Sequence, residues 1–197
     1  MGRPREFAET EALEAAMRCF WTQGYAATSV RDLATRMGIT GASLYNAFGD
    51  KRAVYRRALD HYVQQGMRAR IGRLEAELPP LAAIRAFFAE VIDRSARDPQ
   101  QRGCMLVNAV LEAGPHDAEL RRAVAEEMAF IAAFFRRCVS AGQAEGTIAA
   151  SRHAAALAHM LLSVLLGIRV LARTTPDRAL LEGAAEAALA ALTAPGA

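Results

Sequence analysis

Apolar residues recur at intervals of three and four along almost the whole chain of 197 residues, and this spacing restricts the fold to helices. In the first segment Leu13, Ala16, Met17 and Phe20 follow one another in this way. No stretch of useful length alternates apolar and polar residues as a strand would, and β-branched residues are sparse. The sequence therefore predicts an all-α fold of about nine helices.

Capping and helix-breaking residues mark the ends of these helices. Ser29 lies three residues before Asp32, as in a capping box, and Gly38 suits the left-handed position after the second helix. Pro79 and Pro80 interrupt the chain farther along. The expected helices span roughly residues 6–23, 30–37, 40–47, 50–74, 80–98, 102–112, 117–143, 151–174 and 176–192.

Two short helices joined by a turn of about three residues form a helix-turn-helix pattern within the first 50 residues. Such a motif leaves the start of its second helix free to enter a major groove of DNA. The residues there are small or hydroxylated, so the main chain can approach base edges: Thr40, Gly41, Ala42 and Ser43. Candidates for phosphate or backbone contacts surround them: Ser29, Tyr45, Asn46 and Lys51, with Arg3 and Arg5 in a flexible arm. The alternative is a helical hairpin that only caps a core.

The stretch GYAATSVRDLATRMGITGASLYNAFGDKRAVY resembles the DNA-binding domain of TetR-type transcriptional regulators, and the resemblance extends from Arg5 to about His61. It implies these contacts: phosphates at Ser29, Arg31 and Lys51, bases at Gly41 to Ser43, and the DNA backbone at Tyr45. Ala47 stands where the family commonly has histidine, which removes one polar contact and gives Asn46 more weight.

The resemblance also implies that the chain contains two functional domains. Residues 1–60 would form the DNA-binding domain, and residues 61–197 a helical domain for effector binding and dimerisation. The implied function is a ligand-responsive regulator, with repression preferred to activation. It would bind a palindromic operator on double-stranded DNA as a homodimer, and a small apolar or electrophilic effector would release it.

The charge distribution agrees with this hypothesis. Residues 1–75 hold 12 basic and 8 acidic side chains, a net charge of +4, and residues 76–197 hold 12 and 13, a net charge of −1. Lys51 is the only lysine among the 24 basic residues. The basic excess thus lies in the part that is expected to meet DNA.

The two helices expected at 151–174 and 176–192 are apolar around much of their circumference. Two such helices at one end of a chain fit a four-helix bundle between two protomers. The candidate interface residues are Leu162, Leu166, Leu181 and Leu189. The alternative is that these helices complete the core of a single protomer.

An effector pocket is expected among apolar helices with a few inward polar groups. The candidates are Phe87, Cys104, Asn108, Glu112, Phe130 and Phe134, although the phenylalanines also fit an ordinary core. Cys104, Asn108 and Glu112 are four residues apart and share one helix face. The motif RGCMLVN resembles a branch of the family in which a cysteine senses electrophiles or oxidants; for Cys104 the alternative is a buried structural thiol.

Other classes of protein find less support in the sequence. No metal-ligand spacing, glycine-rich phosphate loop or catalytic constellation is evident, so we expect no metal, no cofactor and no enzymatic activity. An all-α enzyme or small-molecule carrier and a membrane-surface adaptor are the alternatives. The N-terminus lacks the apolar region of a signal peptide, and the apolar stretch 154–170 contains His159, Ser163 and Arg169. We therefore expect a cytoplasmic protein without a membrane partner.

Overall fold

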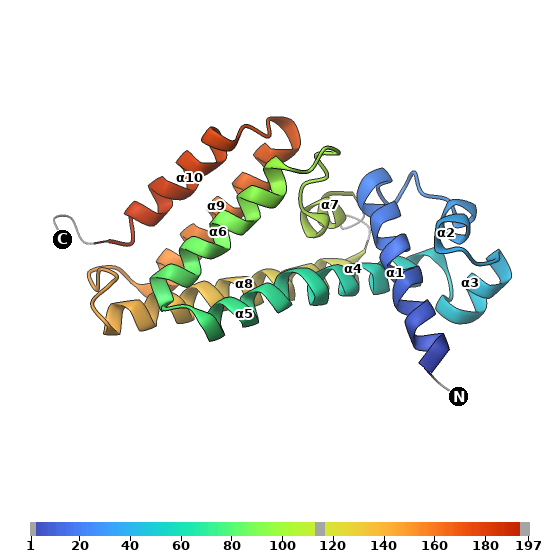
Figure 1. The fold of residues 1–197 in the computed structure, drawn as a ribbon, viewed down its shortest axis with the longest axis horizontal. Helices are drawn as coiled ribbons and strands as arrows, with labels where there is room; N and C mark the ends of the chain where they lie inside the picture. Colours follow the sequence, from blue (N-terminus) through green and yellow to red (C-terminus); the bar gives the residue numbers. More distant parts are fainter. Residues whose placement is uncertain (1–2, 113–116, 194–197) are drawn as a thin grey trace. The chain divides into compact units, whose positions relative to one another are not determined.

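The computed structural model describes the main chain of residues 3–112 and 117–193, and the side chains from residue 9 onward within these ranges. Over these ranges the chain forms ten α-helices and one π-helical segment, with no strand (Figure 1). The prediction of an all-α fold is confirmed. Contacts divide the chain into two compact units, Met1–Arg68 with Met105–Val124 and Ala69–Cys104 with Ala125–Ala197. The division into functional domains at residue 60 stays a prediction.

The first unit is built around the N-terminal helix. Its elements are α1 (Arg3–Gln23), α2 (Val30–Met37), α3 (Gly41–Phe48), α4 (Lys51–Tyr62), the π-helical segment Val63–Arg68, α7 (Met105–Glu112) and the start of α8 (Ala118–Ala144). α1 packs against α2 and α4, and α4 also contacts α7. Phe20 and Tyr55 lie in this core with ring centroids 4.8 Å apart, and both are almost fully buried.

Capping hydrogen bonds between nearby residues determine where the short helices of this unit begin and end. Ser29 and Asp32 form both bonds of the expected capping box, and Gly38 ends α2 with a left-handed φ of 68°. Thr40 caps α3 by accepting a hydrogen bond from the main-chain N–H of Ser43. These bonds lie within the segment that they terminate, which is why the sequence alone predicted α2 with the observed bounds.

Four of the expected helices differ from the structure by three residues or more or in helix type, and one of them, expected over residues 151–174, begins at Ala154. α1 begins at Arg3 rather than near residue 6. The helix expected over residues 50–74 is instead α4, the π-helical Val63–Arg68 and α5 (Ala69–Glu77). α7 begins at Met105 rather than near Arg102, because Gly103 has a left-handed φ of 69° and cannot belong to a right-handed helix.

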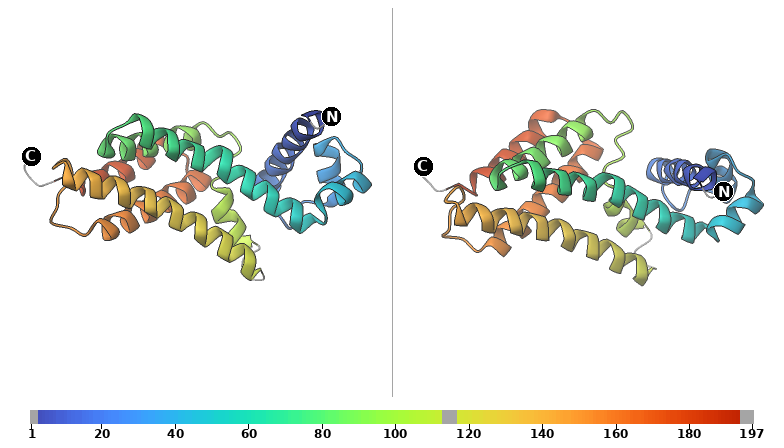
Figure 2. Two further views of the ribbon diagram at one scale, coloured as in Figure 1. Left: turned by 90° about the horizontal axis from the view of Figure 1, so that it is seen from below. Right: turned by 60° about the horizontal axis from the view of Figure 1, so that its bottom comes forward.

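The second unit contains α5, α6 (Pro80–Ala96), the remainder of α8, α9 (Ala154–Thr174) and α10 (Arg178–Ala190). α6 packs against α5, α9 and α10, and α9 lies along α10, as both views in Figure 2 show. Four phenylalanines from α6 and α8 form the centre of this unit, each at most 1% exposed: Phe87, Phe88, Phe134 and Phe135. The rings of Phe87 and Phe134 have centroids 5.4 Å apart.

α9 is long and apolar enough to cross a membrane, with a mean hydropathy of 2.0 over its most apolar window. One face of the helix packs inside the second unit through Leu157, Leu161, Leu165 and Ile168. A helix of this length and composition also occurs in the cores of proteins that cross no membrane, so it is weak evidence for a span. Only 28% of the window is buried, which leaves apolar surface on its other faces.

Candidate nucleic-acid interface

The helix-turn-helix is fixed by packing on its inner side. Leu33 and Ala34 of α2 are buried, as is Leu44 of α3. Within the turn, the main-chain N–H of Ile39 donates to the carbonyl of Ala34 at 3.0 Å. The inner faces of both helices are therefore committed to the core, and the outer face of α3 remains exposed.

The exposed face of α3 presents Ala42, Ser43, Tyr45 and Asn46, as expected. Tyr45 is 55% exposed although it is a large apolar side chain. A Cβ placed on Gly41 would meet nothing within 4 Å, so the main chain at the start of α3 is open to approach. This surface has the small residues and the hydroxyl and amide groups that reading of base edges requires.

The hydroxyls of Thr40 and Ser43 bind each other. Thr40 Oγ1 accepts from the main-chain N–H of Ser43 at 3.1 Å and donates to Ser43 Oγ at 2.9 Å. Thr40 is thus occupied by capping α3, whereas Ser43 keeps its own proton for another acceptor. The base contact predicted for Ser43 fits this geometry better than the one predicted for Thr40.

Ser29 and Asp32 occupy the N-terminus of α2. The carboxylate of Asp32 accepts from the hydroxyl of Ser29 at 2.5 Å and from its main-chain N–H at 2.9 Å. These bonds from Ser29 hold the pKa of Asp32 below its usual range. The Ser29 hydroxyl is bound within the chain and a carboxylate lies beside it, and both features disfavour a phosphate at this position. The phosphate contact of Ser29 stays a prediction.

Three cations close to the helix-turn-helix are candidates for phosphate contacts. Arg31 and Arg36 are exposed on α2, and neither forms an ion pair with any residue whose side chain is described. Lys51 lies at the start of α4, with its Nζ 4.4 Å from the ring centroid of Tyr25 and 3.5 Å from the carbonyl of Ala26. The sequence reasoning missed Arg36, which its place on the polar face of the short amphipathic α2 could have indicated.

Five other basic residues of the first unit are not shown with a free side chain beside α3. Arg3 and Arg5, expected in a flexible arm, have a helical main chain in α1, and their side chains lie outside the described part of the structure. Three further arginines of α4 are held by carboxylates: Arg52 by Asp117 at 2.7 Å, Arg56 by Glu119 and Arg57 by Glu9. The Arg52 guanidinium keeps the pKa of Asp117 well below its usual range. Among the side chains described in α2, α3 and α4, the cations without an ion pair are therefore Arg31, Arg36 and Lys51.

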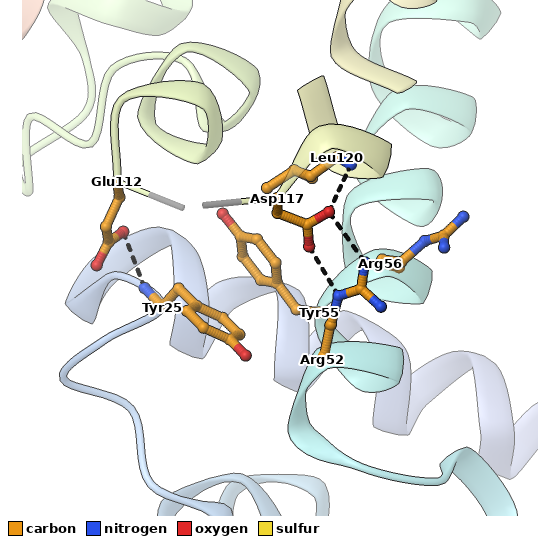
Figure 3. Close-up of a pocket in the computed structure, with 7 residues that line it drawn as sticks. All are labelled: Tyr25, Arg52, Tyr55, Arg56, Glu112, Asp117 and Leu120. Carbon is orange, nitrogen blue, oxygen red and sulfur yellow. Dashed lines mark hydrogen bonds and ion pairs between the residues drawn. The ribbon is translucent and has the colours of Figure 1, made fainter. Parts of the chain in front are cut away.

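A cavity of about 300 Å³ lies between α4, α7 and the loop after α1 (Figure 3). It is lined by Tyr25, Arg52, Tyr55, Arg56, Glu112, Asp117 and Leu120. Burial, with a smaller contribution from Glu112, raises the pKa of Tyr55, so its phenol is neutral at physiological pH. The Glu112 carboxylate accepts hydrogen bonds from the main-chain N–H groups of Tyr25 and Ala26, both at 2.9 Å.

The six effector-pocket candidates are divided between the two units. Glu112 and Asn108 belong to the first unit, and the carboxylate of Glu112 is already bound by main-chain donors. In the second unit Phe87 and Phe134 are core residues with no exposed surface, whereas Phe130 is half-buried. Cys104 is a free thiol, 5% exposed. The effector pocket stays a prediction.

The four interface candidates differ in exposure, and the dimer interface stays a prediction. Leu181 and Leu189 of α10 are buried within the protomer, 0% and 7% exposed, because they face its own core. Leu162 and Leu166 of α9 are half-buried and keep surface for a partner. The apolar side chains that the sequence reasoning overlooked are Val170 on α9 and Leu180 on α10, 50% and 44% exposed.

Comparison with known proteins adds independent observations. The profile described as "Bacterial regulatory proteins, tetR family" matches residues 12–58, and "Tetracyclin repressor-like, C-terminal domain" matches residues 80–188. The chain is 37% identical over 123 residues to the uncharacterized HTH-type transcriptional regulator YezE of Bacillus subtilis, an alignment that covers 62% of this chain and 63% of YezE. It is 27% identical over 173 residues to the HTH-type transcriptional repressor ComR of Escherichia coli, covering 87% of this chain and 82% of ComR.

Solved structures give the same result. A cysteine mutant of the TetR family transcriptional regulator CifR, in complex with 26-bp double-strand operator DNA, superposes with a TM-score of 0.82 and 34% identity. That alignment covers 92% of this chain and 95% of the CifR chain. The reduced form of E. coli NemR has a TM-score of 0.84 at 18% identity, over 96% of this chain and 99% of NemR, and shows the shared fold.

Proposed function

Since this chain belongs to the TetR family and is a DNA-binding transcriptional regulator rather than an enzyme, we propose that it is a homodimeric repressor of a palindromic operator. Relatives whose names include "transcriptional repressor" support repression. The CifR complex, at 34% identity over most of both chains, supports an operator of double-stranded DNA. We place the protein in the cytoplasm, where such an operator lies.

The outer face of α3 carries the proposal. Small residues at its start let the main chain approach base edges, and Ser43 keeps a hydroxyl proton for a base acceptor. Arg31, Arg36 and Lys51 would bind the phosphates on either side, and among the residues with described side chains no carboxylate forms an ion pair with the two arginines. The proposed roles are therefore base reading by residues 41–43 and positioning by the cations.

The homodimer is supported by the uncovered faces of α9 and α10. Val170 and Leu180 expose large apolar side chains, and Gly167 and Gly183 each have open space where a Cβ would stand. Glycine inside a helix costs about 0.5–1 kcal/mol relative to alanine, so its presence on an exposed face suits close approach of another backbone. We propose that these faces meet their copies in a second protomer and bring two α3 helices to one operator.

Release by an effector is the third part of the proposal, assigned with dimerisation to residues 61–197. An effector that prefers a conformation with a different separation of the two α3 helices shifts the population toward free protein. Cys104 is the group that an electrophile would attack. Because that thiol is only 5% exposed, the attack requires a local opening of the chain around it.

Selection from a pool of randomised duplexes tests DNA binding. We expect enrichment of a palindrome that the protein retards in a mobility-shift assay at low salt. Lys51→Ala should weaken binding about equally for all sequences and flatten the salt dependence, while changes at Ala42 and Ser43 should alter sequence preference. Arg97→Ala is the matched control, because it removes one exposed cation from the second unit. No enrichment and no retardation at low salt would exclude the proposed function.

Sedimentation equilibrium tests the dimer. Gly167→Leu places a bulky side chain on the proposed contact face of α9 and should shift the protein toward monomer. Gly72→Leu is the control, since Gly72 is also an exposed glycine within a helix, with open space at its Cβ position. A wild-type monomer at micromolar concentration, or equal dimer affinities for the two variants, would contradict the proposed interface.

A further inference from the structure

Glu112 joins two segments of the first unit that are far apart in the sequence. It is the last residue of α7, and it binds the loop between α1 and α2. Its Oε2 accepts from the N–H of Tyr25 and its Oε1 from the N–H of Ala26, both at 2.9 Å. Figure 3 shows the carboxylate directed at the main chain of Tyr25. A single carboxylate thus fixes two successive peptide groups of this loop, and charge-assisted bonds of this kind are the stronger ones.

The loop is shaped to receive this carboxylate. Gly24 has a φ of +84°, and a Cβ at this position would lie 2.6 Å from Oε1 and 2.9 Å from Oε2 of Glu112. Any other residue at position 24 would be strained and would also displace the carboxylate. The loop and Glu112 therefore fit each other at three successive residues, Gly24, Tyr25 and Ala26.

Lys51 rests on the same two residues that Glu112 holds. Its Nζ lies 4.4 Å from the ring centroid of Tyr25, as in a cation–π contact, and 3.5 Å from the carbonyl of Ala26. The loop end is held as well, because the hydroxyl of Thr28 donates to the carbonyl of Gly24 at 2.6 Å. The position of Lys51 at the start of α4 thus depends on a loop whose N–H groups are bound by Glu112.

We propose that Glu112 is a positioning residue for DNA binding: from α7 it holds the α1–α2 loop, and through Tyr25 and Ala26 it holds Lys51 where a phosphate is bound. This inference rests on the proposed function, which assigns Lys51 to a phosphate. Glu112 itself is an anion and contacts no DNA. Its loss leaves Lys51 charged but no longer fixed, so the phosphate contact weakens.

Glu112→Gln tests the proposal because it keeps the size of the side chain. The amide has one oxygen to accept a hydrogen bond, and its NH₂ group faces a main-chain donor, so one of the two bonds is lost. Affinity is measured by fluorescence anisotropy on the duplex enriched from the randomised pool, over a range of salt concentrations. We expect about tenfold weaker binding, as for the loss of the charge-assisted contact between Lys51 and a phosphate.

The salt dependence separates positioning from general stability. Each phosphate contact contributes about 0.9 to the slope of log K against log salt, so losing Lys51 in both protomers should flatten the slope by about 1.8. Glu112→Gln should flatten it as Lys51→Ala does, and the double variant should flatten it no further. Glu14→Gln is the control, because it removes one negative charge from an exposed carboxylate of the same unit, paired with Arg18.

The outcomes are distinct. A wild-type protein that binds no selected duplex contradicts the proposed function, and a slope unchanged by Lys51→Ala contradicts the assignment of Lys51. If the wild type binds a selected duplex and Lys51→Ala flattens the slope, then a wild-type slope for Glu112→Gln overturns the inference, even if that variant melts at a lower temperature. Gly24→Ala supplies a second variant, since it displaces the carboxylate without changing any charge and should flatten the slope likewise.

Discussion

Replacing Gly24 with alanine probes the fit between the α1–α2 loop and Glu112 by its effect on stability. At a φ of +84° the left-handed conformation costs an L residue about 1–2 kcal/mol. The new Cβ would lie 2.6 Å from Oε1 of Glu112, so the carboxylate must move and lose its bonds to Tyr25 and Ala26. Each of these exposed bonds is worth about 1 kcal/mol net. We expect Gly24→Ala to lower the free energy of unfolding by about 3–4 kcal/mol.

The same substitution in a Glu112→Ala background separates the two causes. With no carboxylate to displace and no bonds to lose, Gly24→Ala should cost only the backbone strain, about 1–2 kcal/mol. Urea unfolding followed by circular dichroism gives the four free energies of the cycle, and the coupling energy should be about 2 kcal/mol. All four are measured at one protein concentration, because the stability of the proposed dimer would depend on it. Costs that agree within about 0.5 kcal/mol in the two backgrounds would refute the reasoning.

Three further predictions concern the core, pH and redox chemistry. Phe134→Ala should lower the free energy of unfolding, measured in urea, by about 3–5 kcal/mol, and Phe130→Ala should lower it clearly less because Phe130 is half-buried. Equal decreases for the two variants would contradict the packing. Arg52 depresses the pKa of Asp117 in the folded state. The contribution of the ionised Asp117 to the free energy of unfolding is therefore complete above about pH 4 and is lost as the pH falls further. The stability difference between the wild type and Asp117→Asn should therefore shrink on acidification from pH 6 to pH 2 in urea titrations, and a constant difference would exclude this effect. N-ethylmaleimide should release operator DNA from the wild type but not from Cys104→Ser, and release from both would exclude this cysteine as the sensor.

The sequence predicted elements whose determinants are local. α2 was predicted with its observed bounds because Ser29, Asp32 and Gly38 lie within or next to it, and their hydrogen bonds span only a few residues. The exposed face of α3 followed from the same short-range pattern. Such bonds depend little on the rest of the chain, so they can be inferred before the fold is known.

The π-helical segment could not be predicted in this way. Val63, Met67, Ile71 and Leu74 are all buried and continue the intervals of three and four that indicate an α-helix. A wider turn accommodates an additional residue without disturbing this apolar stripe, so the pattern is the same with or without it. Only the packing of the surrounding helices distinguishes the two.

Non-local contacts account for the remaining differences. The bonds of Glu112 connect residues 86 and 87 positions apart, and its spacing from Asn108 and Cys104 indicated only a shared helix face. Leu181 and Leu189 were assigned to an interface because an apolar helix face must be buried. Periodicity does not reveal whether that face packs against the same chain or against a second protomer. Within the protomer the two leucines are buried, so they offer little surface to a second chain.

The pairing of the arginines limits what the described side chains can contribute to the salt dependence of DNA binding. The basic residues of 1–75 number 12 in the sequence, yet those of α4 after Lys51 are held by carboxylates. Arg31, Arg36 and Lys51 remain as proposed phosphate contacts with described side chains, six in a homodimer, which corresponds to a slope of about −5 in log K against log salt. A slope steeper than Arg3 and Arg5 could add to this value would mean that cations such as Arg52 leave their carboxylates when DNA binds. Operator binding and the ion pair between Arg52 and Asp117 would then compete, and Asp117→Asn would tighten DNA binding rather than leave it unchanged.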